Sequence, residues 1–207
     1  MSYCPILNFL NSEFIAALSG GLIGGVFTFI AVKMTINHER AKLQQQTGDE
    51  IKAICSAIET EMHCLMERYK KTIGADLIKC KDGEAFNLYY PVEQEYFAVF
   101  HANTAWIGKI KSAETREAVV VAYIAMKGLI DSYKHNNQML MQYEGYLQQA
   151  VTLPQVGGTQ QKFYNELQQA YQRQLVEYAP TLKESHLETL EKVNVALKDL
   201  RAYISSL

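Results

Sequence analysis

An uncharged stretch near the N-terminus constrains this chain more than any other feature of its sequence. It runs over nineteen residues from Phe14 to Val32, FIAALSGGLIGGVFTFIAV, between Glu13 and Lys33. At about 1.5 Å per residue, a helix of this length spans roughly 28 Å, close to the ~30 Å hydrocarbon thickness of a bilayer. The stretch therefore predicts a transmembrane helix over residues 14–33, preceded by a short segment, 1–13.

Two other origins of such a stretch are a cleaved signal peptide and a buried core helix. A signal peptide begins with a basic region, and the first thirteen residues contain no Lys or Arg. Four glycines within residues 20–25 would each cost a helix in water up to about 1 kcal/mol relative to alanine, whereas glycine is frequent in membrane helices. Both observations favour an uncleaved membrane anchor.

Basic residues beside the span predict its orientation. Lys33, Arg40 and Lys42 follow it, and none precedes it. Because basic flanks stay in the cytoplasm, we expect the N-terminus outside and the rest of the chain inside.

Small residues recur along the span at intervals of four. They form two neighbouring columns: Ala16, Gly20, Gly24 and Thr28, and Ala17, Gly21 and Gly25. Such columns let two membrane helices approach closely, so they predict association through the span, with a second copy or with a partner's span. The alternative is a chance pattern in a glycine-rich segment.

The remainder of the chain has the pattern of long helices. Apolar residues at spacings of three and four predict a stalk and first bundle helix over residues 34–74, and a helical bundle over 75–207. The first helix carries Ile51, Ile54, Ile58, Met62, Leu65 and Tyr69 on one face. Asp82-Gly83, a dipeptide typical of tight turns, predicts a small β-hairpin near residues 76–89.

Boundaries inside the bundle follow from capping residues, glycine and proline. A short helix after Pro91 should end near Asn103 or Gly108, and a central buried helix should run from an N-cap at Ser112 to about Ala150. A loop over 153–159 and a helix over 160–178, broken by Pro180, should follow. The last helix carries an apolar stripe that needs a partner helix, in the same bundle or as a coiled coil with a second chain: Leu190, Val193, Leu197, Leu200, Ile204 and Leu207. The predicted fold class is mainly α.

Motifs for chemistry are missing from the sequence. It has no P-loop, GxGxxG, GxSxG, HExxH or EF-hand pattern, and its five histidines lack ligand spacing. We therefore assign no catalytic, cofactor-binding or metal-binding residue and expect a non-enzymatic protein. Cys55 and Cys64 fit packing positions. A net charge of -2 provides no basic field for nucleic acid, so direct nucleic acid binding is not expected.

Aromatic residues concentrate between Tyr89 and Trp106. Tyr96, Phe97, Phe100 and Trp106 are our candidates for docking a protein partner, since aromatics dominate interface energetics. The alternative is that they fill the core of the bundle.

Residues 89–131 resemble a pattern in small bacterial membrane-anchored helical proteins, some of them anti-phage effectors of abortive-infection or retron type. The resemblance rests on Tyr90-Pro91, Phe100, Asn103, Ile107-Gly108, and Tyr123 with Lys127. The retron-linked effectors have two spans, whereas this chain shows one. The resemblance implies a bacterial inner-membrane location and a role in anti-phage defence, and it supplies no catalytic residues.

Three functions remain open at this point. The first is a membrane effector or signalling protein that self-associates through its span and binds a cytoplasmic protein through its bundle. The second is a structural anchor or scaffold that recruits a complex to the membrane. The third is an enzyme, which would need a polar pocket with convergent titratable groups near the aromatic cluster.

Overall fold

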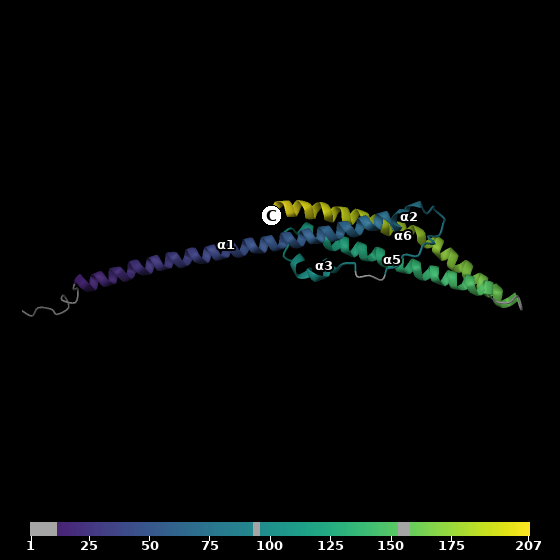
Figure 1. Ribbon diagram of the computed structural model, residues 1–207, viewed down its shortest axis with the longest axis horizontal. Coiled ribbons are helices and arrows are strands. Elements are labelled where there is room, and N and C mark those ends of the chain that lie inside the picture. The colour runs from purple at the N-terminus through teal and green to yellow at the C-terminus, as the bar shows by residue number, and fades with distance from the viewer. Residues whose placement is uncertain (1–11, 93–95, 153–157) are drawn as a thin grey trace, which may run out of the picture. The chain divides into compact units, whose positions relative to one another are not determined.

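The computed structural model describes the backbone of residues 12–92, 96–152 and 158–207, with side chains from residue 17 onward. Within these ranges the protein is helical, with six helices and no strand (Figure 1). The chain divides into two compact units at Glu50, residues 1–50 and 51–207, and each is described by itself. Most of the predicted segment 1–13 and of the predicted loop 153–159 lies outside the described residues.

Helix α1 covers Ser12–Lys71, and its first part, up to Glu50, belongs to the N-terminal unit. It is the one helix in the described part of the chain that is long and apolar enough to cross a membrane, and none of that apolar window is buried. Phe27 and Phe29 are 68% and 70% exposed. The Thr28 hydroxyl donates to the Gly24 carbonyl at 2.8 Å, so the helix satisfies this polar group internally.

Residues 51–207 build their core from three long helices: the second part of α1, α5 (Ala113–Thr152) and α6 (Gly158–Ser206). Fully buried side chains come from each of them, for example Ile58 of α1, Val119 of α5 and Leu200 of α6. A smaller cluster of Met139, Leu140 and Leu175 joins α5 to α6 further along. This arrangement confirms the predicted mainly helical fold with long helices after the apolar one.

Helix α5 begins where the sequence predicts. The Ser112 hydroxyl accepts a hydrogen bond from the Thr115 N–H at 3.1 Å, as expected of an N-cap. Its apolar stretch contributes Val119, Ala122, Met126 and Leu129 to the core, which confirms a buried helix there.

The predicted break at Pro180 is wrong, because α6 continues through that residue to Ser206. Proline removes one donor from the helical ladder, so the carbonyl of Val176 loses its usual partner. Ala179 and Leu182, on either side of Pro180, are both buried. Packing against the core keeps the helix continuous. The apolar stripe beyond Pro180 lies mostly within this bundle, with Val193, Leu197 and Leu200 buried.

The hairpin predicted near residues 76–89 is absent, and all of these residues are described. Ile73–Lys79 forms helix α2 instead, with Asp76 in its first turn and Lys79 in its last, both favourable for the helix dipole. The turn itself is present: Gly83 has φ of 81°, and the Glu84 N–H donates to the Lys81 carbonyl at 3.1 Å. The segments that flank the turn form no ladder with each other.

Two short helices follow, α3 (Ala98–Ala102) and α4 (Thr104–Ile107). The sequence predicts one short helix that ends near Asn103 or Gly108, whereas the structure has two, which end at Ala102 and Ile107, next to those residues. The Asn103 side chain donates to the Val99 carbonyl at 2.8 Å, which closes α3.

Candidate functional site

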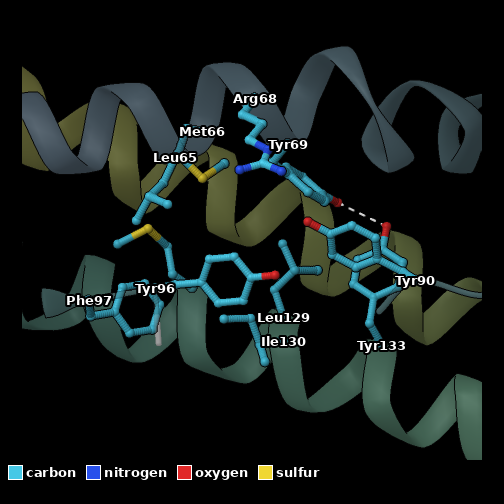
Figure 2. A pocket seen from close by; sticks show the side chains of 11 residues that line it. Leu65, Met66, Arg68, Tyr69, Tyr90, Tyr96, Phe97, Leu129, Ile130 and Tyr133 are labelled. Atoms are coloured by element: carbon cyan, nitrogen blue, oxygen red, sulfur yellow. Dashed lines mark hydrogen bonds between the residues drawn. The ribbon is translucent and has the colours of Figure 1, made fainter. Parts of the chain in front are cut away.

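A buried polar cluster joins the three long helices of the bundle. The Tyr69 hydroxyl of α1 lies 2.7 Å from Nδ1 of His186 on α6 and 3.1 Å from the Tyr133 hydroxyl on α5. Figure 2 shows the bond between the two tyrosines. Burial raises the pKa of Tyr69 to about 12, raises the pKa of Tyr133 further, and lowers the pKa of His186. All three side chains are therefore neutral near pH 7. This suits a structural role in joining the three helices better than a role in proton transfer.

A small cavity adjoins this cluster between α1, α5 and the segment before α3 (Figure 2). Its volume is about 50 Å³, and Tyr69, Tyr90, Tyr96 and Tyr133 contribute to its wall. A space of this size holds a few water molecules, whereas ligand pockets usually measure several hundred Å³. The cavity is too small for a metabolite.

Glu61 of α1 fixes the position of α3. Its carboxylate accepts the N–H groups of Val99 at 2.7 Å and Phe100 at 3.1 Å, and the Tyr123 hydroxyl at 2.7 Å. Burial, and then the contact with Glu61, raise the pKa of Tyr123, so this tyrosine remains a neutral donor. A carboxylate at the start of a helix also interacts favourably with the helix dipole.

Two asparagines of α5 fasten the segment that follows the Gly83 turn. Asn137 accepts the N–H of Tyr90 at 3.1 Å and donates to the Tyr90 carbonyl at 2.5 Å. Asn136 donates to the Phe86 carbonyl at 3.1 Å. The side chains of α5 thus replace the ladder that the sequence predicted as a hairpin.

An open groove of about 580 Å³ lies on the outer side of α5, beside α3. Three of the four predicted docking residues, Tyr96, Phe97 and Phe100, line it. Phe100 lies over Tyr123 with ring centroids 3.8 Å apart, and Phe97 meets the same ring edge-on at 5.4 Å. The full lining is Val92, Tyr96, Phe97, Phe100, His101, Val120, Tyr123, Ile124, Lys127, Ile130, Asp131 and Lys134.

Trp106, the fourth predicted docking residue, does not line the groove. It is partly buried against the core, and the Lys109 ammonium lies 3.5 Å from its ring centroid. Trp106 therefore makes its contacts within its own chain.

The small residues of the span face open space. An added Cβ at Gly20, Gly21, Gly24 or Gly25 would meet no atom within 4 Å, and Ala17 and Thr28 are exposed. Ala16 lies in α1, but its side chain is outside the described set. Within the described residues no group of His, Cys, Asp and Glu side chains could hold a metal ion.

Sequence reasoning did not single out Glu61, Asn137 or His186 as organising residues. One signal was present for His186, which falls in the periodic buried series of Leu182, Thr189 and Val193. A polar residue at such a position must find a partner inside the protein. Glu61 offered no comparable signal, because its partners lie 38 to 62 residues away along the chain.

Comparison of the chain with protein-family models, with curated proteins and with solved structures finds no match.

Proposed function

We propose that this protein is a bacterial inner-membrane effector or signalling protein, in which a single N-terminal span self-associates and a cytoplasmic helical bundle binds a protein partner. The observation that carries the proposal is the exposure of the whole apolar window of α1 together with its open glycine columns.

Membrane insertion accounts for the exposed apolar surface. Ten of the nineteen residues from Phe14 to Val32 are Phe, Ile, Leu or Val. Leaving such a contiguous surface in water is unfavourable, and soluble monomers seldom expose large apolar patches. Lipid covers this surface, and the basic residues after it keep the bundle in the cytoplasm.

Self-association accounts for the glycine columns. Gly20 and Gly24, and likewise Gly21 and Gly25, are one helical turn apart and have open space at their Cβ positions. Because lipid provides no hydrophobic drive between helices, close backbone packing through small residues is the main source of affinity.

The groove on α5 provides the surface for a protein partner of the bundle, which is either a different protein or a second copy of this chain. It combines exposed aliphatic residues such as Ile124 with the rings of Phe97 and Phe100. The resemblance of residues 89–131 to anti-phage effectors makes phage defence the first physiological setting to test.

The decisive experiment replaces Gly20, Gly21, Gly24 and Gly25 with leucine in the full-length protein. We expect the variant to remain in the membrane fraction after alkaline extraction and to lose both span-mediated cross-linking and any effect on membrane permeability. Replacement of Leu18, Leu22 and Val26 with alanine is a control for the change in apolar volume. Unchanged activity of the leucine variant would contradict this mechanism.

A structural anchor is the alternative function, and exchange of the span separates it from an effector. If the protein only recruits a complex to the membrane, exchange of residues 14–33 for an unrelated span of equal length preserves function. An effector that acts through packing of its span loses function in the same exchange.

A further inference from the structure

The groove on α5 has a basic edge. Lys127 and Lys134 line it one above the other, seven residues apart, and between them lies partly buried Ile130. Asp131, the one acidic residue in the described lining, is paired with Lys134 at 3.5 Å. Val120 and Ile124 add apolar surface, 39% and 65% exposed. An occupant of this groove should therefore be apolar along its centre and acidic beside it.

The outer face of α6 in the same unit has that character. Leu187 and Val195 are 64% and 45% exposed although they lie on a helix whose other face is in the core. Glu184, Glu188 and Glu191 flank Leu187, and all three are exposed. Glu191 is near Lys192 at 3.4 Å, whereas no ion pair of Glu184 or Glu188 occurs within the described ranges.

The charges on the two faces have the same spacing. Lys127 and Lys134 are seven residues apart, as are Glu184 and Glu191, which corresponds to about 10.5 Å along a helix in each case. Leu187 lies between the two glutamates as Ile130 lies between the two lysines. An α6 helix laid along the groove therefore brings both lysines to both glutamates while Leu187 covers apolar surface.

We propose that the groove on α5 binds the outer face of α6 from a second copy of this chain. In the proposed contact each copy offers its groove to one neighbour and its α6 face to another, which makes the contact heterologous. Such contacts build rings or open chains rather than closed pairs. Membrane-bound copies would thereby cluster through their bundles, independently of any contact between spans.

Charge reversal provides the test. In full-length protein in detergent, a groove variant carries Lys127→Glu and Lys134→Glu, and a face variant carries Glu184→Lys and Glu191→Lys. Each variant alone places like charges at every junction, so where the spans do not associate we expect co-isolation of two differently tagged copies to fall about tenfold or more. A mixture of the two variants restores opposite charges at every junction, and we expect co-isolation to return.

Two backgrounds separate this proposal from association of the spans. Co-isolation is measured for the native bundle, the groove variant, the face variant and the mixture of the two variants. These four measurements are made with the native span and with Gly20, Gly21, Gly24 and Gly25 changed to leucine. Loss and recovery by charge reversal in the leucine background, where the spans no longer associate, support the bundle contact, and retained co-isolation with the native span then reports association of the spans. A control variant carries Lys162→Glu and Glu166→Lys, both exposed elsewhere on α6, and should leave co-isolation unchanged. Circular dichroism checks that each variant is folded.

Three results overturn the proposal. One is unchanged co-isolation in both single variants in the leucine background. Another is failure of the mixed variants to recover. The third is occupation of the groove by a different acidic protein or by lipid, shown by co-isolation of that molecule with the native groove and its loss from the groove variant while self-association persists.

Discussion

The Tyr69 hydroxyl lies 2.7 Å from Nδ1 of His186, although 117 residues separate the two along the chain. Both side chains are buried, and Nε2 of His186 has no hydrogen-bond partner in the described structure. The imidazole is therefore accommodated in its neutral form, and a proton on it would place an unpaired charge in the core.

This geometry predicts a loss of stability at acid pH. Burial lowers the pKa of His186, so the unfolded chain binds a proton more readily than the folded one. The contribution of neutral His186 to the free energy of unfolding is fully present above both its folded and its unfolded pKa. It declines as the pH falls below about 6.5, the ordinary pKa of histidine, by at most about 1.4 kcal/mol per pH unit. Chemical denaturation at pH 7.5 and 5.5 measures it.

The variant His186→Phe retains an aromatic ring and removes the titration. We expect its free energy of unfolding to change less between these pH values than that of the native protein. Equal pH dependence in the two proteins would show that His186 is not the responsible group.

Removal of the charge at Glu61 should loosen α3. In Glu61→Gln the amide nitrogen cannot accept a hydrogen bond, so at least one of the three donors from Val99, Phe100 and Tyr123 loses its partner. We expect a loss of about 1–3 kcal/mol in unfolding free energy and faster amide exchange over residues 98–107.

Tyr123→Phe is the matched control for this change, since it removes one donor and leaves the carboxylate with the two N–H groups. Its cost should be smaller, about 0.5–1.5 kcal/mol, and amide exchange in α3 should stay near the native rate. Exchange that is equally fast in both variants would assign the effect to Tyr123 and not to the carboxylate.

The sequence predicted features whose cause is local and missed those whose cause is distant. Ser112 caps α5 because its partner is three residues away. The Gly83 turn forms as Asp82-Gly83 indicates, but its flanks are fixed by Asn136 and Asn137, some fifty residues later. No local pattern could place those asparagines opposite that segment.

The groove residues and the cysteines also show that closeness in the sequence does not decide which surface a side chain joins. Tyr96, Phe97 and Phe100 were predicted as a group because they are near neighbours, and they do share one surface. Trp106 was included by proximity alone and packs elsewhere. Cys55 is buried as predicted, whereas Cys64, assigned to packing by the same reasoning, is exposed, because nine residues along a helix turn it to another face.

Pro180 allows a direct measurement of how strongly packing overrides a local signal. Proline in a helix interior costs about 3 kcal/mol relative to alanine. Because α6 is continuous and Pro180 is exposed, Pro180→Ala should restore a bond to the Val176 carbonyl and raise unfolding free energy by about 1–3 kcal/mol. Thr181→Ala, at the exposed neighbouring position, should change it by less than about 0.5 kcal/mol. A destabilised Pro180→Ala variant would mean that the helix requires the proline's geometry.

The native cysteines provide a test of the proposed orientation. Cys4 precedes the span and Cys64 is exposed in the bundle, so a membrane-impermeant maleimide should label intact spheroplasts through Cys4 and lysed cells through both. Cys55 should stay unlabelled in the folded protein, because it is 1% exposed and burial raises the pKa of its thiol, which keeps the reactive thiolate scarce. The measurement uses Cys4→Ser and Cys64→Ser variants, each with Cys80→Ser, so that one accessible thiol remains. Labelling of Cys64, and not Cys4, in intact spheroplasts would reverse the orientation and place the bundle outside the cytoplasm.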